Sequence, residues 1–185
     1  MPLVSLENQK TLKELARQSI DYGVQYHKEI QLQTNHFENE LLIERATFVT
    51  LEMAGDLRGC IGELVATQPL ALSVASNAYK AAFCDPRFMP VQKNEVDLLD
   101  IKISILSQPT EINFSSEEDL LQKLQVNIDG LILKSGFHTG TFLPSVWEEL
   151  HTPQEFFEHL KLKAGLPAGY WDHNIKVFRY TTECF

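Results

Sequence analysis

The N-terminal part of the chain has apolar residues at the spacing of a helix. Leu12, Leu15, Ile20 and Val24 fall on one helical face, and Ser5 stands where it can cap the first turn. Polar residues over 31–40 then predict a loop. The chain is therefore expected to begin with one long amphipathic helix.

Strand patterns and shorter helices follow. Ile101, Ile103 and Ile105 alternate with polar residues, which is typical of a strand buried on one face. The same reasoning predicts strands over 45–53, 57–64, 98–106, 131–134, 141–143 and 175–180. Because these strands come in pairs that look like hairpins, the pattern predicts an α+β fold with a largely antiparallel sheet.

Three helix starts carry recognisable signals. Thr152 is followed by Pro153 and then by Glu155, a cap, a first-turn proline and a capping-box glutamate. A capping box over 115–118 predicts a second helix. A third helix is predicted to begin near Pro69, with this proline in its first turn. The buried stripe of this third helix consists mostly of small residues, so we expect it to pack closely against its neighbour.

Composition places the chain among globular proteins. Its 185 residues are 44% hydrophobic and 22% charged, which excludes a disordered, collagenous or coiled-coil chain and fits one domain over 1–185. The net charge of −9 argues against nucleic acid and anionic membranes as partners. The most apolar stretch, 69–83, is too short and too polar to span a bilayer.

The three cysteines, Cys60, Cys84 and Cys184, do not form a disulfide framework and suit a reducing compartment. No signal peptide is visible in the first residues. We therefore expect a soluble, cytoplasmic protein.

The segment Leu57–Gly62, with the sequence LRGCIG, is the first candidate for chemistry. Gly59 and Gly62 could adopt backbone angles that other residues avoid, and they leave Cys60 without side-chain cover. Arg58 could stabilise a thiolate or hold an anion. The alternative is a β-bulge or tight hairpin in which Cys60 is a small core hydrophobe.

The second candidate is the Asp85-Pro86-Arg87-Phe88 loop. Asp85 and Arg87 could contact a ligand, but the favoured interpretation is an ion pair that fixes the shape of the loop. This interpretation predicts that the two residues act as structural braces beside the LRGCIG segment.

The histidines do not predict a metal site. His151, Glu155 and His159 are four positions apart, but Pro153 places His151 before the helix begins. Phosphate-loop, dinucleotide-binding and nucleophile-elbow motifs are absent from the sequence. The sequence therefore predicts neither a metal nor a cofactor.

The strings FVTLEMAGDLRGCIGEL, NAYKAAFCDPRFMPV, IKISILSQP, IDGLILKSG, TFLPSVW and FFEHLKLKAGLP resemble the AMMECR domain family. Its bacterial and archaeal members are called AmmeMemoRadiSam system protein A. The resemblance extends from about Leu41 to the last strand. It implies an α+β domain of two unequal parts with a cleft between them, and an association with a Memo-type protein and a radical SAM protein. It also marks LRGCIG as a functional surface.

Three hypotheses for function remain open. In the first, the protein is an enzyme component with a small-molecule cleft, in which Cys60 is the catalytic thiol and Arg58, Gly59, Gly62, Asp85 and Arg87 contact the substrate. In the second, it is a non-catalytic binding module that docks on the Memo-type or radical SAM partner. In the third, the LRGCIG hairpin is only a folding element. The sequence identifies no base for the thiol, which weakens the first hypothesis.

Overall fold

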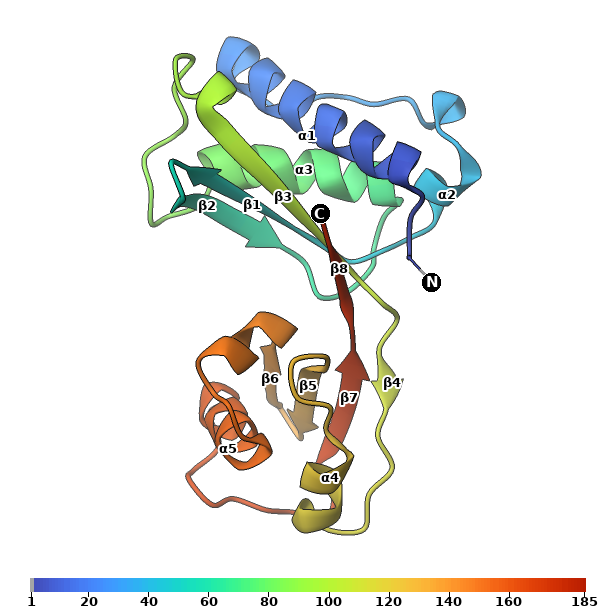
Figure 1. Ribbon diagram of the computed structural model, residues 1–185, viewed down its shortest axis with the longest axis vertical. Helices are drawn as coiled ribbons and strands as arrows, with labels where there is room; N and C mark the ends of the chain where they lie inside the picture. The colour runs from blue at the N-terminus through green and yellow to red at the C-terminus, as the bar shows by residue number, and fades with distance from the viewer. Residues whose placement is uncertain (1) are drawn as a thin grey trace. The chain divides into compact units, whose positions relative to one another are not determined.

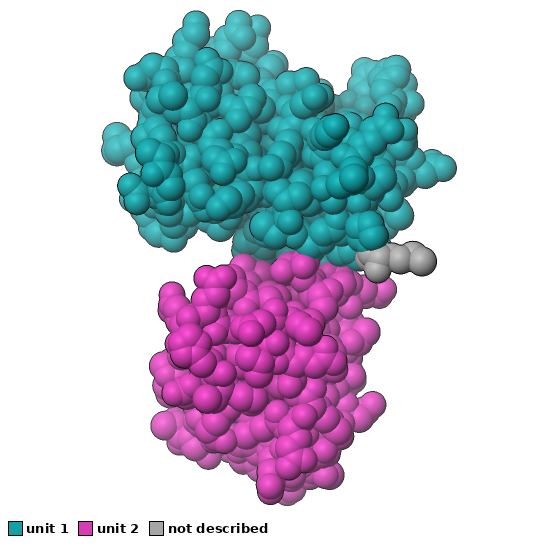
Figure 2. Space-filling model, viewed as in Figure 1, with its two compact units in different colours: residues 1–106, 183–185 teal, residues 107–182 magenta. Residues whose placement is uncertain are grey.

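The computed structural model describes residues 2–185, which form two compact units. The first unit holds the residues up to Leu106 together with Glu183–Phe185, and the second holds Ser107–Thr182 (Figure 2). Each unit combines helices with its own four-stranded sheet, and β1 with β2 and β3, β5 with β6 and β7, and β4 with β7 are antiparallel pairs. The predicted α+β class with a largely antiparallel sheet is therefore confirmed. A single domain over 1–185 stays a prediction.

The sheet of the first unit has the strand order β2-β1-β3-β8 (Figure 1). Its strands are β1 (Thr47–Met53), β2 (Asp56–Gly62), β3 (Leu99–Leu106) and β8 (Thr182–Cys184). Val49 in the central β1 lies opposite Ile61 of β2 and Ile103 of β3. This register places apolar side chains of three strands on one face.

Two helices cover that face, α1 (Leu6–Tyr26) and α3 (Leu70–Phe83). Figure 1 shows them lying side by side against the sheet. The short helix α2 spans Asn39–Leu42, and 3-10 turns span Thr34–His36 and Val96–Leu98. The core joins fully buried residues of both helices and the sheet, among them Leu12, Ile20, Val49, Leu51, Val74, Ala78 and Ile103. The opposite face of the sheet carries alternate, more polar residues.

The second unit has the strand order β4-β7-β5-β6. The elements are β4 (Thr110–Glu111), α4 (Glu117–Lys123), β5 (Gly130–Ser135), β6 (His138–Phe142), a 3-10 turn over Pro144–Glu148, α5 (Pro153–Lys163) and β7 (Lys176–Tyr180). Trp147 stacks on Phe156 with ring centroids 3.8 Å apart, and its indole N–H donates to the Asp129 carbonyl at 2.7 Å. Both aromatic residues are fully buried, so they form the centre of a separate core.

Two of the three predicted helix starts are confirmed, and the third needs a correction. The Thr152 hydroxyl accepts the N–H of Glu155, and Ser116 likewise caps α4. Pro69, however, is the N-cap of α3 with extended backbone, so the prediction that it lies inside the first turn was wrong. No helix among residues 2–185 is both long and apolar enough to cross a membrane.

Candidate functional site

The LRGCIG segment forms most of β2, an edge strand of the first unit's sheet. A tight turn at Ala54 and Gly55, whose φ angles are 52° and 89°, joins β1 to β2 and closes the hairpin. In the register, Leu51 lies opposite Gly59 and Glu52 lies opposite Leu57, so Arg58 is the extra residue of a bulge. The segment is thus both a hairpin strand and a bulge, which confirms the backbone shape of the alternative interpretation; its placement of Cys60 in the core was wrong.

Cys60 lies directly opposite Thr50 on the sheet face away from α1 and α3. Its neighbours Gly59 and Ile61 face the helices, and successive side chains of a strand point to opposite faces. The Cys60 Sγ lies 3.2 Å from the Thr50 hydroxyl, and the side chain is half-buried. Cys60 is therefore a partly accessible thiol on an open sheet face and not a member of the helix-covered core.

Asp85 closes the outer edge of β2 beside Cys60. One carboxylate oxygen accepts the Cys60 backbone N–H at 2.9 Å, and the carboxylate also accepts the backbone and guanidinium N–H groups of Arg87. The Asp85 side chain is almost fully buried. The guanidinium of Arg87 and these N–H groups outweigh burial and hold the pKa of Asp85 far below its usual range. The residue is thus a buried anion that joins the loop after α3 to the strand.

Arg58 is also held by protein groups. Its guanidinium forms a two-pronged ion pair with Glu95, with N–O distances of 2.9 and 3.1 Å, and donates to the Met89 carbonyl at 2.8 Å. The hydrogen bonds from Arg58 outweigh burial and lower the pKa of Glu95. Both side chains are mostly buried. The bulge therefore directs Arg58 toward the loop before β3.

The two glycines of the motif are needed for close packing. A Cβ on Gly59 would lie 2.1 Å from the Ala81 carbonyl oxygen of α3, and one on Gly62 would lie 2.2 Å from the Phe48 ring. Neither glycine has a positive φ, so the expectation of backbone angles closed to other residues was wrong. The predicted close packing of the small-residue helix is confirmed at Gly59.

The structure brings all the predicted site residues together around β2, and it adds two that the sequence analysis did not single out. Thr50 contacts the thiol and Glu95 holds Arg58. Alternation along β1 would have placed Thr50 on an exposed face, but its strand partner could not be read from the sequence. Glu95 lies 37 positions from Arg58 and carries no local signal. Ligand contacts and a catalytic role for Cys60 stay predictions.

The regularly spaced residues His151, Glu155 and His159 do not form a metal-binding cluster. His151 precedes the Thr152 cap and contacts the Trp147 carbonyl through Nδ1. Within residues 2–185, no three His, Cys, Asp or Glu side chains are placed to hold one metal ion.

A model of the AMMECR1 family matches residues 13–185, which include every residue of this site. The chain belongs to the AMMECR1 family. The resemblance drawn from the LRGCIG and DPRF strings is thereby confirmed.

Relatives that match most of this chain are found in several organisms. A protein of Methanothermobacter thermautotrophicus is 34% identical over 184 residues, which cover 98% of this chain and 95% of the relative. Protein MJ0810 of Methanocaldococcus jannaschii is 38% identical over 146 residues, or 77% and 73% of the two chains. The crystal structure of uncharacterized protein PH0010 from Pyrococcus horikoshii is similar with a TM-score of 0.86 and 34% identity, covering 99% of this chain and 93% of that one. The AMMECR1 fold thus extends over nearly the whole chain.

Proposed function

We propose that this AMMECR1-family chain is a non-catalytic binding component of an AmmeMemoRadiSam-type system. The contact surface is the face of the first unit's sheet that surrounds Cys60 and is not covered by α1 and α3. The partner that binds there is the Memo-type or the radical SAM protein. The free state of all three cysteines is in keeping with a cytoplasmic location, which belongs to the same proposal.

The pairing of both arginines at the motif carries this proposal. Arg58 is paired with Glu95 and mostly buried, so it cannot anchor a substrate anion without breaking an internal ion pair. Arg87 is bound to Asp85 through Nε and Nη2, although its side chain is 54% exposed. The same bonds fasten the connection between α3 and β3, residues 84–98, to β2 at two places. A strand held in this way is suited to present a fixed surface to a partner.

The residues beside Cys60 on that face are polar and partly exposed. Lys102 of β3 lies across β1 from Cys60, pairs with Glu52 at 2.7 Å and remains 44% exposed. Thr50 lies between Cys60 and Lys102. A hydroxyl, a thiol and an ion pair in one row offer a polar contact surface of the kind that partner proteins use.

A thiol-dependent enzyme with a small-molecule site is the second candidate. The contact between Thr50 Oγ1 and Cys60 Sγ favours it, because this contact fixes the orientation of a partly accessible thiol. Among the hydrogen bonds of residues 2–185, however, the thiol has no histidine or carboxylate partner to remove its proton.

Substitutions at one position separate the two candidates. Cys60→Ser keeps a group that can bond to Thr50 but removes the thiol, whereas Cys60→Trp places a large ring on the sheet face. For a binding component, Cys60→Ser retains co-purification with the Memo-type and radical SAM proteins and Cys60→Trp abolishes it. Cys84→Ser is the matched control, since Cys84 is an exposed thiol outside β2.

The enzyme candidate predicts that Cys60→Ser already abolishes the function. Metabolite conversion by the mixed proteins would stop with Cys60→Ser, although the proteins still co-purify. If Cys60→Trp folds, as circular dichroism reports, and co-purifies as well as the unchanged protein, the binding surface does not lie at Cys60 and the proposal is wrong.

A further inference from the structure

Two lysines lie directly opposite each other in the sheet of the second unit. Lys134 of β5 and Lys176 of β7 are register partners, so their side chains share one face of the sheet. Their neighbours Leu133 and Val177 belong to the core around Phe156, and successive side chains of a strand point to opposite faces. Both lysines therefore lie on the face that this core does not use, and both are exposed.

The two ammonium groups lean in the same direction along the sheet. Nζ of Lys134 lies 5.2 Å from the centre of the Phe178 ring, and Nζ of Lys176 lies 3.7 Å from a carboxylate oxygen of Glu111. Phe178 and Glu111 are directly opposed residues of β7 and β4. The two positive charges are thus placed over one pair of neighbouring residues.

This arrangement lowers stability as long as its charge is not compensated, because like charges at directly opposed strand positions repel each other. Lys134 forms no ion pair with any carboxylate of residues 2–185. The pair of Lys176 with Glu111 is long and its side chains are 62% and 45% exposed, so it contributes little. A chain with 25 acidic and 16 basic residues thus leaves two adjacent cations almost uncompensated.

A pocket adjoins the second of these lysines. It has a volume of about 310 Å³ and is lined by residues 111–114 and 173–176, where the chain before α4 runs beside the chain that leads into β7. Ile112, Ile175 and the half-buried Phe114 contribute apolar surface to it. The side-chain amides of two lining residues, Asn113 and Asn174, add polar groups. The pocket therefore offers room for an uncharged organic group next to a cation.

We propose that the two lysines and this pocket bind a small organic phosphate monoester. The phosphate group lies between the ammonium groups of Lys134 and Lys176, and its oxygens accept hydrogen bonds from both. A phosphate monoester carries a charge of about −1.5 to −2 at neutral pH, which matches two ammonium groups better than the single charge of a carboxylate does. The organic part of the ligand occupies the pocket beside Phe114.

Glu111 makes the proposal sharper, because it is the carboxylate of this pocket. A phosphate group between the lysines replaces Glu111 as the partner of Lys176 and is repelled by its charge. Removal of the Glu111 charge is therefore expected to strengthen binding. If the lysines served only to hold β4 against β7, Glu111 would be needed and its loss would bring no such gain.

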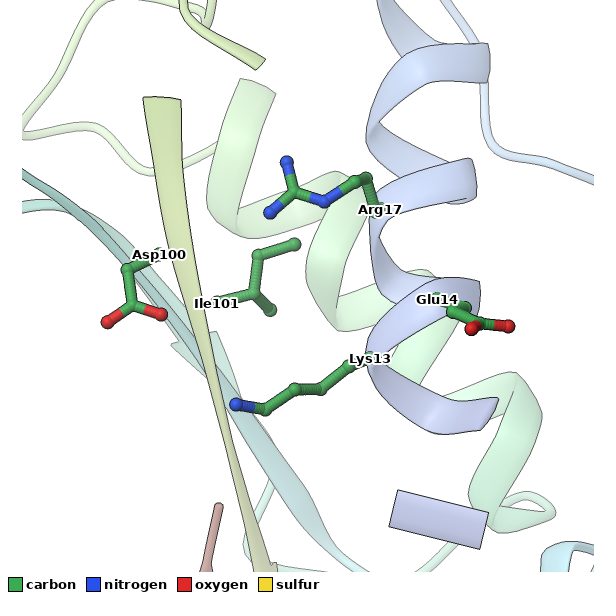
Figure 3. A pocket seen from close by; sticks show the side chains of 5 residues that line it. All are labelled: Lys13, Glu14, Arg17, Asp100 and Ile101. Atoms are coloured by element: carbon green, nitrogen blue, oxygen red, sulfur yellow. The ribbon is translucent and has the colours of Figure 1, made fainter. Parts of the chain in front are cut away.

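A basic pocket of the first unit has a different arrangement. Figure 3 shows Lys13 and Arg17 reaching from α1 toward β3 on either side of Ile101. The guanidinium of Arg17 donates to the carbonyls of Val96 and Leu99 at 2.6 and 2.8 Å, so it already has acceptors within the protein. Lys13 is then a single cation without a second one beside it that is free of protein partners. We assign no ligand to that pocket.

Nuclear magnetic resonance of the full chain labelled with nitrogen-15 tests the site, with phenyl phosphate as the probe. Lys134→Gln and Lys176→Gln each weaken binding by about tenfold or more, because one of two charge-assisted contacts is lost. Lys163→Gln is the matched control and stays within about twofold. Lys163 also lies over an aromatic ring, 4.8 Å from the centre of Phe142, but on the face that α5 covers. Glu111→Gln strengthens binding by about threefold or more.

Two further probes identify the class of ligand. Phenyl sulfate is a monoanion of the same shape and binds at least about fivefold more weakly than phenyl phosphate. Vesicles that contain phosphatidic acid present the same phosphate chemistry at a membrane surface, and they are expected not to bind. Circular dichroism verifies that each variant is folded. The site belongs to the second unit, so its failure leaves the function proposed for Cys60 untouched.

Several outcomes would overturn the proposal. One is that about 10 mM phenyl phosphate shifts no amide signal of Lys134, Lys176 or Phe178. Others are equal weakening by Lys163→Gln and Lys134→Gln, or weaker binding by Glu111→Gln. Equal affinities for phenyl sulfate and phenyl phosphate would exclude recognition of a dianion. Binding of the vesicles without binding of phenyl phosphate would assign the lysines to a membrane surface and not to a small molecule.

Discussion

The carboxylate of Asp85 accepts the backbone N–H of Cys60 at 2.9 Å, where a neighbouring strand would otherwise bond to β2. The Arg87 guanidinium completes this arrangement 3.5 Å from the Cys60 carbonyl. Side chains of one loop thus replace the backbone of an absent strand, which is one way in which proteins protect an exposed sheet edge.

Removal of the Asp85 carboxylate should destabilise the protein. Asp85→Ala leaves the Cys60 N–H and the Arg87 guanidinium without their acceptor, and we expect the free energy of unfolding to fall by about 1–3 kcal/mol. Urea titration measures the change. Asp97→Ala removes an exposed aspartate and is expected to stay within about 0.5 kcal/mol of the unchanged protein. Equal effects of the two substitutions would contradict a bracing role for Asp85.

The contribution of Asp85 should depend on pH in a defined direction. Because folding lowers the pKa of Asp85, its stabilisation is present above the unfolded value of about 3.9 and is lost as pH falls through the lower folded value. The difference in unfolding free energy between the unchanged protein and Asp85→Asn should therefore be largest near neutral pH. It should shrink steadily below about pH 4. A difference that is constant from neutral to acidic pH would show that the charge of Asp85 is not what stabilises the loop.

Arg58 and Glu95 should be energetically coupled. Their two-pronged ion pair is mostly shielded from solvent, so a double-mutant cycle with Arg58→Ala and Glu95→Gln should give a coupling energy of about 1–3 kcal/mol. Chemical denaturation of the four proteins provides the measurement. Lys123 and Asp119, an exposed pair one helical turn apart on α4, supply the control, for which about 0.3–0.5 kcal/mol is expected. Equal coupling in the two cycles would mean that burial of the Arg58 pair has no effect.

Gly59→Ala should force α3 away from the sheet. The added methyl group would meet the Ala81 carbonyl oxygen, a backbone atom that no rotamer change can move aside. We expect a loss of about 1–3 kcal/mol, read from thermal melting followed by circular dichroism. Leu57→Ala alters an exposed position of the same strand and should have a much smaller effect. Unchanged melting of Gly59→Ala would mean that the helix is not seated as tightly as the structure shows.

Local signals determined how much of the fold was predictable. The α5 start needs only Thr152, Pro153 and Glu155, which are neighbours in the chain. Gly165 after the helix has a positive φ of 81°, the conformation in which glycine commonly ends helices. β4 and β8 were not predicted because strands of two and three residues have no measurable periodicity. Their pairing depends on residues far away in the sequence, such as Ile103 and Phe185.

In the candidate site, too, only the contacts between residues close in the sequence were predictable. Asp85 and Arg87 flank a proline, so bracing could be inferred from three adjacent residues, and the structure contains their ion pair. The partner of Arg58 could not be inferred, since Glu95 reaches it only after α3 and the following loop have folded. The glycines were identified as special for the wrong reason, because the constraint on Gly59 comes from Ala81 on α3 and not from its own φ angle.

The position of the Trp147–Phe156 stack has a practical consequence for measurements on this protein. Both tryptophans, Trp147 and Trp171, belong to the second unit, whereas the longest helices, with 21 and 14 residues, belong to the first. Tryptophan emission therefore reports melting of residues 107–182, and far-ultraviolet circular dichroism is weighted toward the unit that contains Cys60. Recorded on one sample, the two spectroscopic signals would reveal whether the chain loses its structure in one step or in two.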